Sequence, residues 1–173
     1  SKMLDSVNAD TKMIAARTTA NLALAEDVMV SSAIIDGGGL DVLCKGAMLE
    51  GEPEASMQCI AALFLACREE RFLATMGQLQ VGASMVQLGL SGVNQDETKN
   101  VLISKITATL ALNKSSRRFL HADNSTFAQD LVALIKANTS TECGVWLGQA
   151  LRFYCDGAPE PYALVEVGIG SAL

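Results

Sequence analysis

Small and apolar residues recur at helical spacing in four stretches of the chain, at positions 10–24, 53–67, 96–112 and 140–154. In the first stretch Ile14, Thr18 and Leu22 follow at four-residue intervals, which places them on one face of a helix. Polar residues suited to helix capping stand at or near the start of the stretches, as Asp10, Glu52 and Asp96 do. The pattern predicts four long helices and gives no convincing strand.

Each long stretch is followed by the same series of shorter features. A short charged break, such as Glu26-Asp27, leads to a short helix, then to a glycine or serine turn, and then to a further helix such as 40–49 or 127–137. The turn in "DGGG" at 36–39 is expected to need positive φ, as helix-ending turns do, and Gly82 and Gly168 are expected to repeat it. The sequence thus predicts three helices in each unit.

Two separate sequence markers recur in these units, and both recur at nearly the same spacing. The phrase Asn21-Leu22-Ala23 has counterparts later in the chain, and the central positions 22, 65, 110 and 153 are 43, 45 and 43 apart. The turn positions 38, 82, 125 and 168 are 44, 43 and 43 apart. We therefore expect a single domain, 1–173, of units at approximately 8–50, 51–94, 95–138 and 139–173, the last one incomplete. Because such a unit buries its apolar faces only by stacking, the prediction is an all-α, right-handed α-solenoid with one concave face.

Composition narrows the class of protein. Half of the residues are hydrophobic, yet no stretch reaches the roughly 18 apolar residues that span a bilayer, and the first residues lack the apolar core of a secretory signal. Five cysteines without CxxC spacing are expected to be buried thiols in a reducing compartment, which favours the cytoplasm. A net charge of −6 argues against a nucleic-acid binder.

Catalytic chemistry is not indicated. His121 is the single histidine, so any Ser-His-Asp, Cys-His or zinc site would depend on it. The glycines at 36–39 are not followed by Gly-Lys-Ser/Thr, so they do not form a phosphate-binding loop. We expect no enzyme activity, no metal and no cofactor.

The segment "AARTTANLALAEDVMVSSAIIDGGGLDVL" at 15–43 resembles the armadillo-repeat family, with its paired alanines, "NLA" helix end and "GGL" turn. HEAT-like repeats are the nearest alternative. The resemblance implies that the four long helices line a groove. In armadillo importins a tryptophan, followed one turn later by an asparagine, recurs along these helices and binds basic peptides. Here the tryptophan-equivalent positions hold Arg17, Ile60, Lys105 and Gly148, and the asparagine-equivalent positions hold Asn21, Phe64, Thr109 and Arg152.

Only Asn21 matches that ladder, which argues against binding of nuclear-import cargo. Three cations, Arg17, Lys105 and Arg152, would instead attract an acidic peptide segment, with apolar anchors on Ile60 and Phe64. The predicted partner-binding residues are Arg17, Asn21, Ile60, Phe64, Lys105, Thr109 and Arg152. The plainer alternative is that these are solvated charges and that Phe64 is a core residue.

Two other functions stay open beside a peptide-binding scaffold. The chain could be an architectural subunit of a larger assembly. It could also be a fragment of a UCS-type myosin chaperone. The segments "KITATLALNKSSRRF" and "WLGQALRFYC" of this sequence resemble the repeats of those chaperones in style. In each case the partner is another protein, and the apolar segment that ends at Leu173 suggests a longer chain or a larger complex.

Overall fold

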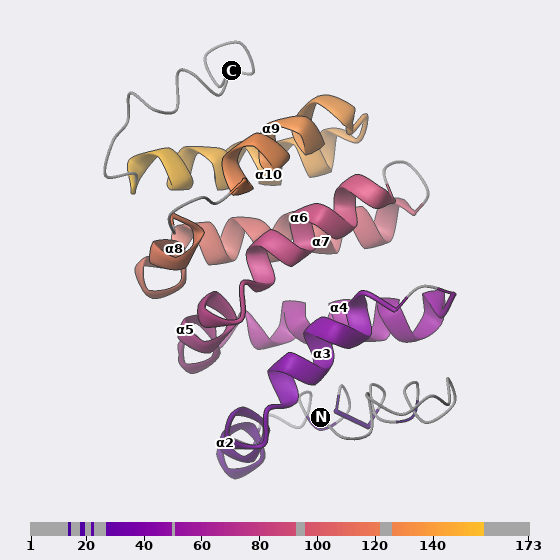
Figure 1. Cartoon of the computed structure of the whole chain (residues 1–173), viewed down its shortest axis with the longest axis vertical. Helices are drawn as coiled ribbons and strands as arrows, with labels where there is room; N and C mark the ends of the chain where they lie inside the picture. The colour runs from indigo at the N-terminus through magenta and orange to yellow at the C-terminus, as the bar shows by residue number, and fades with distance from the viewer. Residues whose placement is uncertain are drawn as a thin grey trace. The chain divides into compact units, whose positions relative to one another are not determined.

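The computed structural model describes residues 27–49, 51–92, 96–121 and 126–157, together with Ile14, Thr18, Thr19 and Leu22. All regular elements in these residues are α-helices, which confirms the all-α prediction (Figure 1). The helices are α2 (Val28–Asp36), α3 (Gly39–Ala47), α4 (Pro53–Ala66), α5 (Glu70–Gln78), α6 (Val81–Ser91), α7 (Glu97–Leu112), α8 (Lys114–Leu120), α9 (Phe127–Ala137) and α10 (Thr141–Asp156).

Local sequence explains where several helices begin. Pro53 is the first residue of α4, where its missing N–H costs no helical hydrogen bond. The Asp96 carboxylate accepts a hydrogen bond of 3.0 Å from the Lys99 backbone N–H, so Asp96 caps α7 as its sequence predicted. Asn113 ends α7 and caps α8 by accepting from the backbone of Ser115. Glu52, which was also predicted to cap a helix, precedes α4 without a side-chain capping hydrogen bond.

The expected glycine turns are only partly correct. Gly38 has φ of 73° and precedes α3 in the left-handed conformation, as predicted. In the next unit the left-handed residue is Gln80, with φ of 55°, and Gly82 lies inside α6. A Cβ on Gly82 would lie 2.9 Å from Leu120 Cδ2, so this glycine serves close packing against α8 instead of the turn. Gly168 lies outside the described residues.

The chain divides into two compact units, Ser1–Thr75 and Met76–Leu173. In the first unit α3 packs on α4, and the buried residues of these two helices include Leu40, Leu43, Cys59 and Leu63. The Ser56 hydroxyl donates a 2.6 Å hydrogen bond to the Ala47 carbonyl, which joins the end of α3 to the start of α4. In the described part of the chain no helix is both long and apolar enough to cross a membrane.

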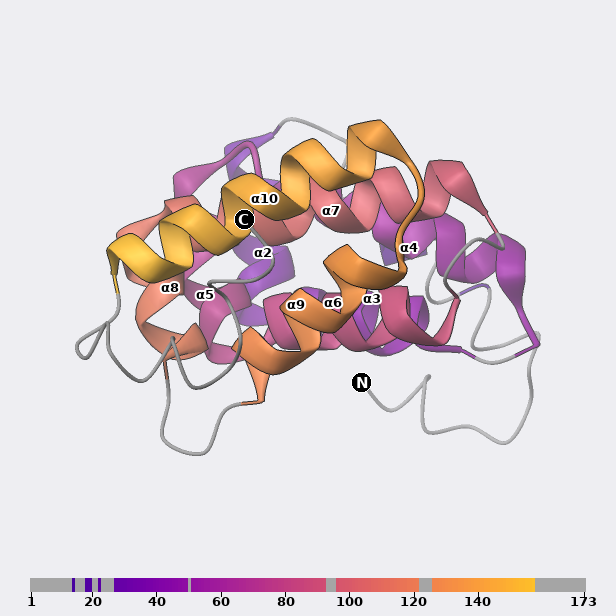
Figure 2. The ribbon, with the colours of Figure 1, turned by 90° about the horizontal axis from the view of Figure 1, so that it is seen from above.

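In the second unit two helix pairs stack on each other. α6 packs beside α7, and α9 packs beside α10; α9 also covers α6, and α10 covers α7 (Figures 1 and 2). A cluster of buried residues fills the space between them, including Val86, Ala108, Phe127, Leu131 and Leu147. The pair α6 and α7 is therefore covered by the pair that follows it in the chain.

Candidate protein-interaction surface

Five of the eight buried positions of α7 are buried again on α10, with an offset of 43 residues. Asn100, Ser104, Thr107, Ala108 and Ala111 are buried on α7. The residues 43 positions later are buried on α10: Cys143, Leu147, Ala150, Leu151 and Tyr154. The other three buried residues of α7, Ile103, Ile106 and Leu110, correspond to Trp146, Gln149 and Phe153, which are not buried. The two helices pack side by side, and we call the pair α6 and α7 and the pair α9 and α10 two steps.

Polar side chains link equivalent positions of the two steps. The Gln87 amide donates to Asp130 at 2.7 Å, and the Ser140 hydroxyl donates to Glu97 at 3.0 Å; each pair is 43 positions apart. Ser140 therefore uses its hydroxyl to bridge to α7 and does not cap α10 by a side-chain hydrogen bond. These bonds fix the offset between the steps.

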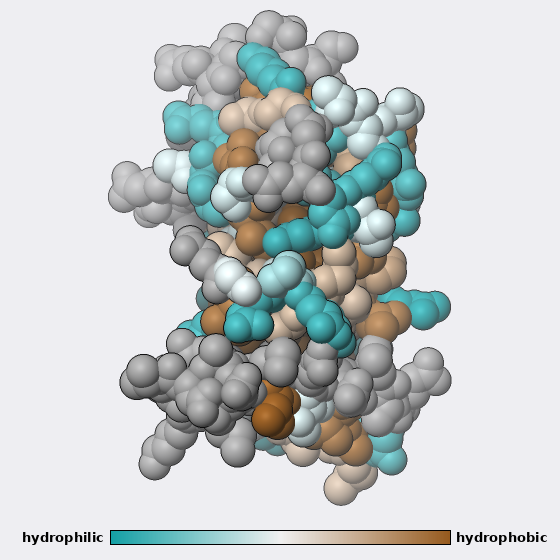
Figure 3. Space-filling model, turned by 90° about the vertical axis from the view of Figure 1, so that its right-hand side faces the viewer, coloured by the Kyte–Doolittle hydropathy of each residue, from teal (hydrophilic) through white to brown (hydrophobic). Residues whose placement is uncertain are grey.

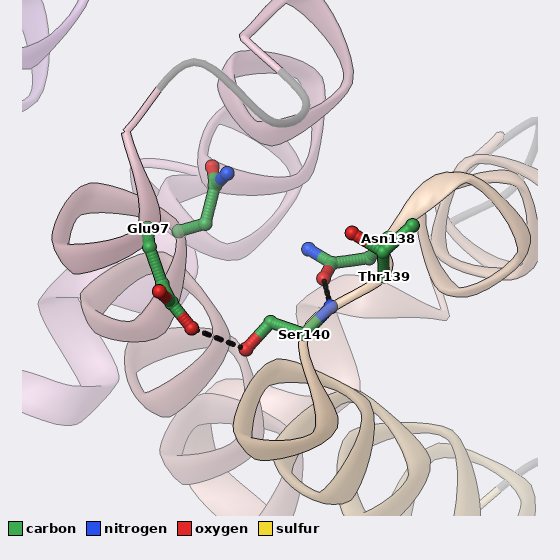
Figure 4. A pocket seen from close by; sticks show the side chains of 5 residues that line it. Glu97, Asn138, Thr139 and Ser140 are labelled. Carbon is green, nitrogen blue, oxygen red and sulfur yellow. Dashed lines mark hydrogen bonds between the residues drawn. The ribbon is translucent and has the colours of Figure 1, made fainter.

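The second of these links borders a polar pocket of about 290 Å³, lined by Glu97, Asn100, Asn138, Thr139 and Ser140 (Figure 4). The Asn138 side chain accepts from the Ser140 backbone N–H at 2.9 Å, while the Ser140 hydroxyl points to Glu97. In Figure 3, which views the side of the molecule where α7 and α10 begin, hydrophilic residues make up much of the described surface of the second unit. Three of the five lining residues, Glu97, Asn138 and Ser140, are thus joined by hydrogen bonds that connect the start of α7 to the start of α10.

Lys105, one of the predicted groove cations, is already paired. Its Nζ lies 2.9 Å from Oε1 of Glu142 and 5.8 Å from the ring centroid of Trp146, both on α10. An acidic ligand would have to displace the Glu142 carboxylate to reach this ammonium group. Glu142 and Trp146 were not among the predicted site residues, although their four-residue spacing places them on one face of the helix.

Thr109 and Arg152 are the other two predicted site residues of the second unit, and they differ in exposure and in the partners of their side chains. The Thr109 hydroxyl donates to the Lys105 carbonyl at 2.9 Å, one turn earlier in α7, so it is satisfied within its own helix. Arg152 is exposed and forms no ion pair with any described residue. Of the two predicted cations in the second unit, Arg152 is thus the one open to a ligand.

Arg152 borders an apolar hollow of about 540 Å³ on α10, whose lining is Gly144, Val145, Gly148, Gln149, Leu151, Arg152, Cys155 and Asp156. Val145 is 54% exposed, which is high for an apolar side chain. We call Lys105, Thr109, Glu142, Val145, Gln149 and Arg152 the ladder surface. It combines an accessible cation with an exposed apolar side chain.

The first unit corrects one predicted site residue. Ile60 has no exposed surface, so it belongs to the core and is not available to a peptide. The buried positions 56, 59, 60, 62, 63 and 66 of α4 match 100, 103, 104, 106, 107 and 110 of α7 with an offset of 44. The "NLA" phrase gave an offset of 45 residues between these two helices and so aligned Ile60 with Lys105. With the offset of 44, the residue equivalent to Lys105 is Ala61. Phe64 is half-buried. Arg17 and Asn21 lie outside the described residues.

His121 packs between helices and has no catalytic partner in the described residues. Its ring stacks on Tyr154 with centroids 4.1 Å apart, and Nε2 is buried without a hydrogen bond to any described group. Burial, and next the charge of Arg117, lower the pKa of His121, while a backbone hydrogen bond at Tyr154 opposes this shift. Arg117 itself donates to the Phe153 carbonyl at 2.9 Å, which ties α8 to α10.

None of the five cysteines, all of which are described, forms a disulfide, and four of them are buried. Burial raises the pKa of Cys59 to about 11 and that of Cys67 to about 12, so both are poor nucleophiles. Among the described residues, no group of three or more His, Cys, Asp or Glu side chains is arranged to hold a metal ion. Comparison with protein-family models, curated proteins and solved structures gave no match to this chain.

Proposed function

We propose that this chain is a non-enzymatic helical-repeat scaffold of the armadillo type, which binds a peptide segment of a partner protein along its long helices. The observation that supports the proposal is the common burial register of α7 and α10, since stacked steps with one offset present equivalent side chains side by side. An extended peptide has a regular repeat as well, so it can contact several steps in succession.

The ladder surface favours a peptide with at least one carboxylate and an apolar side chain. Arg152 offers an exposed guanidinium, and Val145 offers exposed apolar area, both on α10. Lys105 contributes less attraction than its charge suggests because Glu142 occupies it at 2.9 Å. Arg152 is therefore the residue on which we expect recognition of an acidic group to depend.

Titration of labelled peptides tests the proposal. One peptide carries glutamates and leucines, and a second carries lysines at the glutamate positions; binding is followed by fluorescence anisotropy. We expect the acidic peptide to bind and Arg152→Glu to weaken it roughly tenfold, because an attraction and a repulsion of up to about 1 kcal/mol each are involved. Glu142→Gln should strengthen binding a few-fold because it releases Lys105.

The matched control is Arg118→Glu, which makes the same change of charge in the same unit. Arg118 is exposed on α8, where its guanidinium lies 4.6 Å from the Phe119 ring centroid, and it is not one of the residues of the ladder surface. It should leave the affinity for the acidic peptide unchanged. Equal binding of the acidic and basic peptides, or equal losses in Arg152→Glu and Arg118→Glu, would contradict the proposal.

A further inference from the structure

The polar pocket beside the start of α7 contains a buried amide that the fold leaves without a hydrogen bond. Asn100 lines this pocket and is 6% exposed, yet none of the described residues donates to its side-chain amide or accepts from it. A buried polar group without a partner destabilises a fold, because it has lost its hydrogen bonds to water. The partner of the Asn100 amide must therefore come from within the pocket.

Two neighbours of Asn100 in the pocket keep unused hydrogen-bonding capacity. Glu97 accepts from the Ser140 hydroxyl through Oε1 at 3.0 Å, which leaves Oε2 without a partner among the described residues. Asn138 accepts from the Ser140 backbone N–H through Oδ1 at 2.9 Å, which leaves its NH₂ group as a donor. Figure 4 shows Glu97 on one side of the pocket and Asn138 on the other. The pocket thus offers acceptors and donors to one ligand.

The electrostatics of the pocket favour a neutral ligand. Among the five lining residues Glu97 alone is charged. α7 begins at Glu97 and α10 begins directly after Ser140, so the positive ends of two helix dipoles lie beside this carboxylate and offset part of its charge. An anion would be repelled by Glu97, and a calcium ion would find a single carboxylate ligand.

We propose that the polar pocket binds a carboxamide group, and that this group is the side chain of a glutamine or asparagine in the partner peptide. A carboxamide has two N–H donors and a carbonyl acceptor, so it can donate to Glu97 and Asn100 and accept from Asn138. A side-chain amide reaches the buried Asn100 at the end of a flexible chain, whereas an extended main chain carries bulk at every residue. The origin of the group in a peptide rests on the proposed function; the binding of a carboxamide does not.

Propionamide tests the pocket without a peptide. Binding is followed by the side-chain NH₂ signals of Asn100 and Asn138 in heteronuclear NMR spectra, with propionate and propylammonium as charged ligands of similar size. We expect propionamide to shift both signals saturably, with a dissociation constant on the order of 1–10 mM for so small a ligand. The two charged ligands should bind more weakly, because neither has both a donor and an acceptor.

Three variants locate the binding. Glu97→Gln keeps an acceptor for Ser140 but removes the second carboxylate oxygen, and Asn100→Leu replaces the buried amide by an apolar side chain of similar size. Each should weaken propionamide binding roughly tenfold, as the loss of one or two hydrogen bonds does. Asn100→Leu should not lower Tm, since the amide that it removes has no partner in the described fold. The matched control is Gln78→Leu, which removes an exposed carboxamide from α5 and should leave binding unchanged.

Other outcomes would overturn the inference. No saturable shift with propionamide would show that the pocket holds solvent only. Tighter binding of propylammonium would show that the charge of Glu97 determines the ligand. Equal weakening by Asn100→Leu and Gln78→Leu would place the binding elsewhere.

The source of the carboxamide is tested with two series of acidic peptides that carry either glutamine or methionine at each position in turn. Stronger displacement of propionamide by a glutamine peptide supports a side chain. Equal displacement by both series would mean that the main chain is bound, and would overturn the assignment to a side chain. If no peptide binds while propionamide does, the peptide source fails together with the proposed function, whereas the carboxamide pocket stands.

Discussion

Replacing either of two glycines in the second unit by alanine should change the free energy of unfolding, in opposite directions at the two positions. Gly77 is buried in α5, and a Cβ there would lie 2.7 Å from Ser116 Cα and 2.8 Å from Phe119 Cδ2. A backbone atom cannot move aside as the end of a flexible side chain can. Gly148 is in the middle of α10, and a Cβ there meets nothing within 4 Å. The same chemical change therefore tests packing at one position and helix propensity alone at the other.

The expected magnitudes follow from these two terms. Gly148→Ala should raise the free energy of unfolding by about 0.5–1 kcal/mol, which is the usual gain when alanine replaces glycine inside a helix. Gly77→Ala has a similar gain, but overpacking costs roughly 1–3 kcal/mol. Because the contacts of Gly77 are with backbone and a ring, we expect a net loss of about 1–2 kcal/mol.

Urea unfolding followed by circular dichroism measures both changes in the free energy of unfolding. At this chain length each kcal/mol should move Tm by about 2–4 °C, so thermal melts should rank the variants in the same order. If Gly77→Ala is as stable as the wild type, the close approach of α5 to α8 is not present in solution. If Gly148→Ala is less stable, the space above α10 is filled.

Two further predictions concern ionisable groups of the described residues. The pKa of His121 in the folded protein is below its usual value of 6.5, so the unfolded chain binds the proton more readily than the folded chain does. The free energy of unfolding should therefore fall as pH decreases through 6.5 toward the lowered pKa, and His121 should add no pH dependence above 6.5. His121→Phe, which keeps a ring against Tyr154, should remove this part of the pH dependence in urea titrations; an unchanged profile would show that other groups cause it. In the native protein at neutral pH a thiol reagent should modify Cys155 first, and all five cysteines only after unfolding; rapid modification of Cys59 or Cys67 would contradict their burial.

The hydrophobic pattern predicted the helices well, because amphipathic spacing and caps are local properties. The predicted stretch 96–112 is observed as Glu97–Leu112, and 127–137 is observed as Phe127–Ala137. The site was predicted less well because it depends on register. An error of one residue rotates a side chain by about 100° around a helix, which is enough to assign the buried Ile60 to a surface.

Contacts between distant residues were also beyond the sequence pattern. Nothing in the spacing along the chain shows that Glu142 reaches Lys105, since a period identifies equivalent residues but not the partners they meet across the interface. Likewise the left-handed turn residue is Gln80, although Gly82 is the better candidate by propensity. Gly82 instead lies inside α6, close to the Leu120 side chain.

The polar links between helices of the second unit also bear on how such a chain folds. The bonds of Gln80 to Phe119, Gln87 to Asp130 and Arg117 to Phe153 join residues 39, 43 and 36 positions apart. The loop that must close to form each link is therefore about one unit long, however many units follow. Contact order should fall as units are added, so a longer array should fold no more slowly per step than this one. Growth of the chain from the ribosome would let each new unit dock on a neighbour that is already folded.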